Sequence, residues 1–244
     1  MAISGIASTV HRVDDHTVVH DNQTPTIHFV GHFVIWHQYF PATYKKTMRD
    51  ECGNTSESMK VYETAVFDPV TGFGGNAPFV QATSEQNPPN VTGSTGGECV
   101  EDSPFVASQY MPSFPEPGYL CHDFISWIMS TFSDPALVQK PLEQPDNRRS
   151  TFQHEGTPSL EERNIHGDVH FGAGSVLRDV GNVANSPSDP LFCLHHGEPI
   201  EPFDCSGMNI TLDFTIKIGK FAGDATLKDL LNMEGRILCF IYAS

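Results

Sequence analysis

The spacing of apolar and polar residues predicts helices in several parts of the chain. Apolar residues recur at helical spacing through residues 121–132. Another helix is expected over residues 37–50 and should end at Gly53, provided that Pro41 can be accommodated. A further helix is predicted to start at residues 189–190, where the aspartate is a good N-cap and the proline suits the first helical position.

Two other stretches have the character of a loop and a strand. Residues 74–118 are rich in Gly, Pro, Asn, Ser and Thr, which is typical of a long surface loop with little regular structure. Residues 237–242 are apolar and predict a closing strand. The pattern therefore indicates a mainly α fold with long loops and few short strands.

Charge, hydrophobicity and length limit the partners and the domain organisation that this chain can have. The net charge is -16 with only 14 Lys and Arg, which argues against nucleic-acid or anionic-membrane partners. No apolar run reaches the roughly 18 residues of a transmembrane helix. With 244 residues and 39% hydrophobic content, residues 1–244 are expected to form a single domain with one sizeable core.

A group of histidines near the end of the chain has metal-ligand spacing. His166 and His170 are four residues apart, so both imidazoles lie on one helical face about 6 Å apart at Cβ and can reach one ion. His196 lies two turns into the helix that starts at Asp189, whereas His195 points about 100° away. We therefore predict a second trio of ligands, His166, His170 and His196. His195 is expected either to support these ligands without binding the metal or to lie in the core.

A first trio near the start of the chain is less strongly specified. His20 is expected at the end of a short helix, His28 in the turn after Pro25, and His37 on the helix that follows. A single histidine on a helix is more often a core or surface residue, so spacing alone leaves this trio open. His122 and His154 lack a partner pattern and are expected to be ordinary loop or surface residues.

The sequence does not decide whether the protein is secreted or stays inside the cell. Six cysteines and four N-glycosylation sequons would suit a secreted glycoprotein. The cysteines are Cys52, Cys99, Cys121, Cys193, Cys205 and Cys239, and the sequons begin at Asn22, Asn54, Asn90 and Asn209. Against secretion, residues 1–15 have neither the basic start nor the apolar stretch of a signal peptide, unless the start of the chain is incomplete.

Several stretches resemble the tyrosinase family, in particular short fungal tyrosinases and catechol oxidases. The stretches are residues 20–40, with IHFVGHFVIWHQYF at 27–40, residues 49–53 (RDECG), residues 67–76 (FDPVTGFGGN) and residues 186–196 (SPSDPLFCLHH). The last is similar to the family's second copper signature, in which the later histidine of the pair is the ligand. The resemblance implies a four-helix bundle around a dinuclear site and identifies both trios as ligands of two copper ions.

The implied chemistry is oxidation of o-diphenols to o-quinones by dioxygen. Two copper ions on neutral imidazoles, roughly 3.5–4 Å apart, leave an open face where dioxygen can be reduced while a small phenolic substrate gives up two electrons. Within that scheme, Phe192 packs on the second trio, either as core or against substrate. Residues 170–174, with Phe171 among them, would form a small-residue wall of the substrate mouth.

Departures from the family pattern bear on this activity. Tyrosinases that hydroxylate monophenols commonly have Asn directly after the first histidine of the second trio, where this chain has Gly167. Weak or no monophenol hydroxylation is therefore expected, although some fungal catechol oxidases share a Gly there. Fungal relatives often cross-link a Cys to the second histidine of the first trio, but Thr26 stands at that position, so no thioether can form.

Other departures suggest a shortened chain. A charged pair common in the family is replaced by Gln38 and Ile200, and Pro199 and Pro202 stop the last copper helix early, which would open the pocket. The Trp-rich segment that relatives carry after the motif ending at Gly53 is absent.

Three hypotheses remain from the sequence. The first is a type-3 copper oxidase of o-diphenols. The second is a zinc-dependent enzyme similar to the cyclopenases of fungal secondary metabolism, since neutral imidazoles suit zinc as well as copper. The third is a truncated, inactive tyrosinase-like protein.

Overall fold

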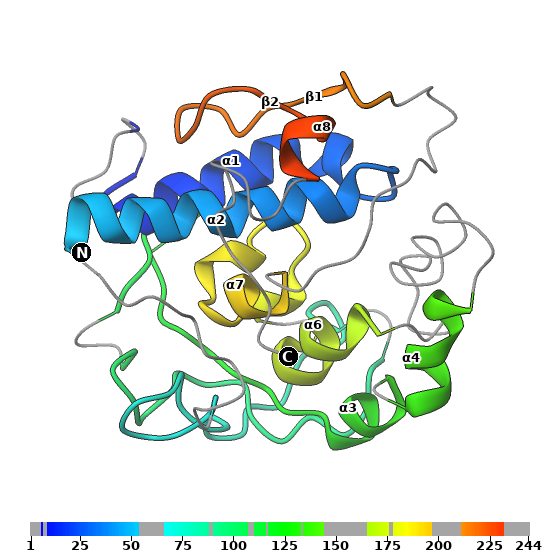
Figure 1. Ribbon diagram of the computed structural model, residues 1–244. Coiled ribbons are helices and arrows are strands. Elements are labelled where there is room, and N and C mark those ends of the chain that lie inside the picture. The colour runs from blue at the N-terminus through cyan, green and yellow to red at the C-terminus, as the bar shows by residue number, and fades with distance from the viewer. Residues whose placement is uncertain are drawn as a thin grey trace.

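The structure is a computed structural model that describes residue 6 and residues 9–53, 66–87, 90–106, 110–115, 117–132, 134–143, 165–175, 178–196 and 211–231. This part of the chain is mainly helical, as the sequence pattern predicts, with a small antiparallel sheet of two strands. The long helices α1 (Arg12–Ile27) and α2 (Phe33–Cys52) lie side by side next to the short helices α6 (Gly167–Gly174) and α7 (Leu191–His195) (Figure 1). The remaining elements are α3 (Ser126–Phe132), α4 (Pro135–Leu142), the 3-10 turns η1 (Asp179–Gly181) and η2 (Ser186–Ser188), β1 (Thr215–Ile216), β2 (Ala225–Thr226) and α8 (Leu227–Leu230).

Helix α1 is longer than the sequence suggests. His20 does not end a short helix, because α1 continues through Pro25 to Ile27. Pro25 is tolerated because it lies near the end of the helix and removes only the hydrogen bond to the carbonyl of Asp21. The expectation for His20 was therefore wrong: the residue lies inside a regular helix, which holds its backbone more rigidly than a helix end would.

Helix α2 follows the sequence expectation. It contains Pro41 and ends at Gly53, whose φ of 69° is left-handed and whose N–H donates to the carbonyl of Met48. Only a residue that tolerates positive φ can close the helix in this way, which explains the glycine.

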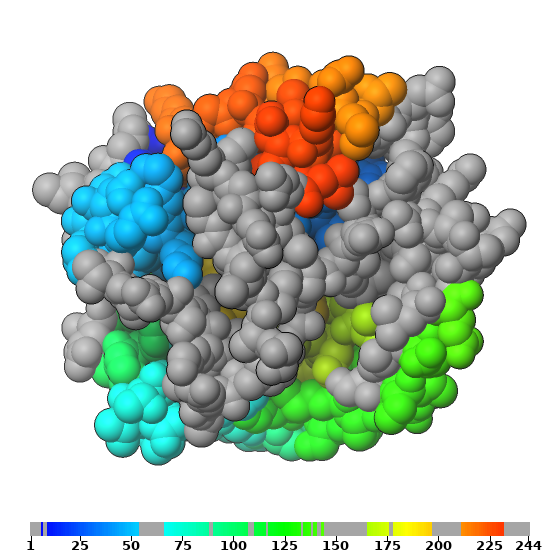
Figure 2. All heavy atoms as spheres, in the orientation of Figure 1, coloured from blue at the N-terminus to red at the C-terminus, as the bar shows by residue number. Residues whose placement is uncertain are grey.

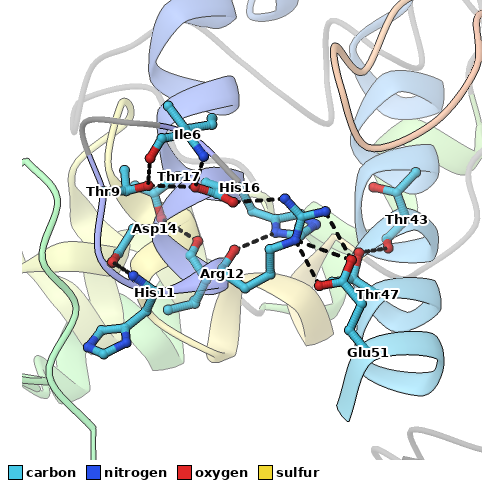
Figure 3. A network of polar contacts seen from close by, with 12 residues as sticks. Ile6, Thr9, His11, Arg12, Asp14, His16, Thr17, Thr43, Thr47 and Glu51 are labelled. Atoms are coloured by element: carbon cyan, nitrogen blue, oxygen red, sulfur yellow. Dashed lines mark hydrogen bonds and ion pairs between the residues drawn. The ribbon is translucent and has the colours of Figure 1, made fainter. Parts of the chain in front are cut away.

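A polar network joins the start of α1 to the end of α2 (Figure 3). Arg12 donates from Nη2 and from Nε to the carboxylate of Glu51, each at 3.0 Å, and from Nη1 to Asp15 Oδ2 at 2.8 Å. The Asp15 carboxylate is fully buried and also accepts from the Thr9 hydroxyl at 2.5 Å. The network therefore fixes the two helices that carry the first trio relative to each other.

The largest apolar cluster joins α1, α2, α7 and residues 211–231. Trp36 and Phe40 of α2 pack with Phe192 of α7, and the indole N–H of Trp36 donates to the carbonyl of Lys217 at 3.2 Å. Residues 211–231 form the orange and red layer over the blue helices in Figure 2. This layer covers the side of α1 and α2 that faces away from α6.

The middle of the chain is largely irregular, as predicted. Residues 66–87 and 90–106 contain no helix or extended strand, only isolated bridges such as Cys99 with Cys121. The helix expected over residues 121–132 begins only at Ser126, because the backbone before it bonds to distant residues, as in the hydrogen bonds from Asp123 to Ala173 and from Ile125 to Gly172. The predicted strand at 237–242 lies outside the described residues.

The described chain contains free cysteines and no helix suited to spanning a membrane. Cys52, Cys99, Cys121 and Cys193 are free thiols in the described chain. Among its helices, none is both long and apolar enough to span a bilayer.

Candidate metal centre

The first trio is assembled from three positions on α1 and α2. His20 lies within α1, His28 caps its C-terminal end, and His37 lies just over one turn into α2. One ring nitrogen from each lies within 4.8 Å of the others, and the Nε2 atoms of His20 and His37 are 3.3 Å apart. The structure thus brings together the three histidines that the sequence had left open.

The second trio is assembled from α6 and α7. His166 is the residue before α6, His170 lies inside that helix, and His196 follows directly after α7. The start of α7 agrees with the sequence to within one residue, and the Asp189 carboxylate accepts from the N–H of Leu191 at 2.9 Å. Ring nitrogens of the trio and of the adjacent His195 lie within 4.8 Å of one another.

Five of the six imidazoles in the two trios have Nδ1 beside a backbone carbonyl. The pairs are His20 with Ala184 (2.9 Å), His28 with Thr24 (3.0 Å), His37 with Phe33 (2.8 Å), His170 with Val180 (2.5 Å) and His196 with Phe192 (3.0 Å). A carbonyl only accepts, so each Nδ1 carries the proton and each Nε2 carries a lone pair. This is the tautomer that metal-binding histidines adopt when their other nitrogen is oriented by a carbonyl.

The Nε2 atoms are arranged as a cation would require. With both Nδ1 protonated, the Nε2 lone pairs of His20 and His37 face each other at 3.3 Å, which is repulsive unless a cation lies between them. The Nε2 of His196 is buried without a hydrogen-bond partner in the described chain. The residues present therefore fit bound metal ions at both trios.

Burial keeps these imidazoles neutral. Desolvation lowers the pKa of His20 to about 3 and that of His28 to about 4, with further lowering from neighbouring histidines. Desolvation also lowers the pKa of His37 and His196 well below its ordinary value, and that of His170 to a smaller extent. Neutral imidazoles keep the lone pair that a metal needs, so little proton competition is expected near neutral pH.

Two phenylalanines separate and support the trios. Phe192 is fully buried and stacks on His196 with ring centroids 3.9 Å apart, while its ring lies 5.2 Å from that of His20. Phe33 lies 4.3 Å from His37 and 4.9 Å from His166, again between ring centroids. The sequence pointed to Phe192 but missed Phe33, whose position on α2 four residues before His37 was the available signal. Because the rings of His37 and His196 stack at 4.9 Å, the two trios are neighbours.

His195 and His196 differ in their surroundings. One ring nitrogen of His195, Nε2, lies 2.8 Å from the carbonyl of His166 and is therefore engaged with the backbone. The corresponding nitrogen of His196 has no such partner. The choice of His196 as ligand and of His195 as its supporting neighbour stays a prediction.

The small residues of α6 are closely packed. Gly172, Ala173 and Gly174 are buried, and a Cβ at Gly172 would lie 2.6 Å from the side chain of Met129. Phe171 packs on a cluster that includes Phe132. This face of α6 packs against α3 and the residues around η1, and a role of residues 170–174 at the substrate mouth stays a prediction.

Gly167 is buried at the first position of α6. A Cβ there would lie 3.1 Å from the ring of Phe132 and 3.2 Å from that of Phe171. Glycine at this position therefore allows close packing of two aromatic rings beside His166.

His122 is not an ordinary loop or surface residue. Its side chain is fully buried, Nδ1 lies 3.1 Å from the carbonyl of Gly75, and Nε2 lies 3.5 Å from Asp189 Oδ2. The sequence could not predict this burial, because the partners of His122 come from distant parts of the chain. His154, Pro199, Ile200 and Pro202 lie outside the described residues, while Gln38 is buried in α2.

Known proteins share this architecture. The chain is 25% identical to Tyrosinase P of Aspergillus terreus, over 99% of this chain and 83% of that protein, and 25% identical to Oxidase hkm6 of Aspergillus hancockii, over 95% and 100%. It is 28% identical to N-acetyl-6-hydroxytryptophan oxidase ivoB of Emericella nidulans, over 76% and 61%. The fold superimposes on a mutant polyphenol oxidase from Thermothelomyces thermophila with a TM-score of 0.73 at 23% identity, over 96% of this chain and 78% of that one.

The alignments also bear on the length of the chain. The alignment with Tyrosinase P spans 303 positions, more than the 244 residues present here, so that relative carries segments without a counterpart in this chain. The common central domain of tyrosinase matches residues 10–198, which is well over half of the sequence. The chain therefore belongs to the tyrosinase family.

Proposed function

We propose that this protein is a type-3 copper oxidase that converts o-diphenols to o-quinones with dioxygen, with little or no hydroxylation of monophenols. The observation that carries the proposal is the pair of adjacent, buried or half-buried trios, in which five of the six imidazoles turn Nδ1 to a backbone carbonyl and leave Nε2 for a metal ion. In this assignment, His20, His28 and His37 hold one copper ion. His166, His170 and His196 hold the other. Two copper ions held in this way would supply the electron transfer from the diphenol to dioxygen.

The chain's own residues hold and orient the ligands. Five backbone carbonyls fix the Nδ1 protons of the trio imidazoles, so that the rings cannot rotate away from the ions. Phe33 and Phe192 contribute apolar walls beside the rings and exclude water from them. A flat aromatic substrate suits such surroundings, and one relative is named for the oxidation of a hydroxylated tryptophan derivative.

Gly167 supports the restriction to diphenols. A monophenol must lose its proton to a placed base, a step that is typically worth about 10² to 10⁴ in rate. Gly167 offers no amide to orient a water for that step. The missing side chain at Gly167 is what supports this restriction.

The test begins with the metal content of the purified protein. Two copper ions per chain support the proposal, zinc would favour the cyclopenase-like alternative, and the absence of bound metal would favour an inactive protein. Oxygen uptake is then compared for a simple catechol and the matching monophenol after copper loading. Comparable rates on both would contradict the Gly167 argument, and no uptake despite two bound copper ions would overturn the proposed oxidase.

A matched pair of variants separates the effect of a side-chain amide at position 167 from the effect of added bulk. Gly167→Asn and Gly167→Ala both place a Cβ against Phe132, but only the Asn variant adds a group that can orient water. Monophenol oxidation should rise relative to catechol oxidation in Gly167→Asn alone. An equal rise in Gly167→Ala would show that altered packing, rather than the amide, controls the ratio.

A further inference from the structure

His122 lies in a buried charged cluster outside both trios. Its ring is enclosed by the aromatic rings of Phe67 and Phe124, with centroids at 6.0 Å and 5.6 Å. The Asp189 carboxylate that faces it is also fully buried. His122 Nε2 lies 3.5 Å from Asp189 Oδ2, and neither atom has a hydrogen-bond partner in the described chain.

The surroundings of the ring determine its charge. Nδ1 faces the carbonyl of Gly75 at 3.1 Å and Nε2 faces the carboxylate of Asp189. Either neutral tautomer would turn a lone pair towards one of these oxygens, whereas the imidazolium can donate to both. A buried carboxylate would also be unpaired if the ring were neutral, which is costly.

The other charged groups around His122 agree with this assignment. Although burial opposes the charged form, the contact with Asp189 and the nearby Asp179 raise the pKa of His122 overall. Burial and repulsion from Asp189 raise the pKa of Asp179 to about 6, while Ser188, Arg178 and His122 oppose that rise. One imidazolium therefore shares a buried pocket with two carboxylates and one nearby arginine.

Asp189 connects this cluster to the second trio. Its Oδ1 accepts from the N–H of Leu191 at 2.9 Å, and its backbone carbonyl accepts from the N–H of Phe192 at 3.0 Å. These bonds start α7, the helix that His196 directly follows. On the other side of the cluster, Val180, the residue after Asp179, accepts from His170 Nδ1.

We propose that His122, as a buried imidazolium, is a positioning residue for the second metal site, because it holds Asp189 and so fixes the start of the helix that carries His196. The inference rests on the proposed function in that it assumes a metal ion at the second trio. His122 touches neither the ion nor the substrate and acts through Asp189. Partners of this outer kind typically change metal affinity by about 10- to 100-fold.

The first measurement needs no metal. In the metal-free protein, nitrogen chemical shifts of His122 from NMR, assigned with a His122→Gln variant, should show two protonated ring nitrogens at pH 7. A single protonated nitrogen would overturn the proposal, whatever the metal content.

The second measurement compares the two sites within one protein. In His122→Gln, chelator competition should show one of the two bound copper ions weakened by about 10- to 100-fold and the other changed by less than about threefold. The control is Tyr110→Phe, which removes the hydrogen bond from the buried Tyr110 hydroxyl to the carbonyl of Ser188, the residue before Asp189. It disturbs the same segment without removing a charge, and both affinities should be retained.

A double variant separates charge from structure. His122→Gln leaves the Asp189 carboxylate buried and unpaired, whereas His122→Gln with Asp189→Asn leaves two neutral amides that can bond to each other. The double variant should therefore bind the second ion more tightly than His122→Gln alone. No recovery, or an equal weakening of both sites in His122→Gln, would overturn the positioning role. If the unaltered protein bound no metal, the proposed function itself would fail, which is a different result from two bound ions with no effect of His122.

Discussion

Replacing Phe192 by Ala tests whether the ring between the trios is part of a closed core. Phe192 is fully buried and touches imidazoles of both trios as well as Phe40, whose ring centroid is 5.8 Å away. Because it packs on all sides, the neighbouring rings cannot collapse into the space without displacing trio histidines. The cost should therefore reach the roughly 3–5 kcal/mol found for Phe to Ala in tightly packed cores.

That cost is large for a domain with a total stability of about 5–15 kcal/mol. The assay is equilibrium unfolding of the metal-free protein in urea, followed by two optical probes to check two-state behaviour. With a urea slope of about 3 kcal/mol per M, the midpoint should fall by about 1 M or more. Phe79→Ala is the matched control, since that side chain is 56% exposed and its loss should change stability by less than about 0.5 kcal/mol.

A loss below about 1 kcal/mol in Phe192→Ala, with an unchanged slope, would refute this reasoning. The ring would then line an open space, and the alternative role of Phe192 as a direct contact for substrate would be favoured. If Phe192→Ala cannot be purified, Phe192→Leu keeps much of the volume and should give a smaller loss in the same assay.

Three further predictions concern the trios and their protonation. His170→Ala should remove about one of two bound copper ions, measured by elemental analysis; unchanged stoichiometry would refute its assignment as ligand. His196→Ala should empty the second site while His195→Ala retains the ion with altered activity at most, and the opposite order would show that the ligand assignment on α7 is wrong. Burial lowers the pKa of His16 to about 4, and it also lowers the pKa of most trio histidines. Below pH 6.5 the unfolded metal-free chain therefore binds protons that the folded chain does not bind. The contribution of these histidines to stability should be complete above about pH 6.5 and fall towards pH 4, by up to about 1.4 kcal/mol per pH unit for each such histidine. The raised pKa values of His122 and Asp179 act in the opposite direction but concern fewer groups, so urea midpoints that are equal at pH 5 and pH 7 would contradict this.

Local spacing was enough to identify the second trio. His166 and His170 are related by one helical turn, and the Asp-Pro start of α7 fixes the phase of His196. The first trio could not be settled in the same way, because His28 lies at the end of α1 and meets His20 and His37 only when α1 and α2 are packed together. Spacing within one helix is encoded locally, whereas packing between helices depends on the whole core.

Two of the missed features depend on contacts between distant residues. The burial of His122 follows from Gly75 and Asp189, which lie far from it in the sequence. The burial of Gly172 follows from the close approach of α3. In both cases the local sequence resembles an ordinary loop or a run of small residues, so only the tertiary structure reveals its role.

The hydrogen bond from His20 to Ala184 has a thermodynamic consequence for metal loading. His20 belongs to the first trio, but its Nδ1 donates to a carbonyl in the segment that leads into α7 and the second trio. An ion at the first trio would hold His20 and thereby this segment, so part of the ordering needed at the second site would already be complete. By linkage, the second ion must favour the first to the same extent. We therefore expect the two ions to bind cooperatively, with singly loaded protein scarce at intermediate copper concentrations.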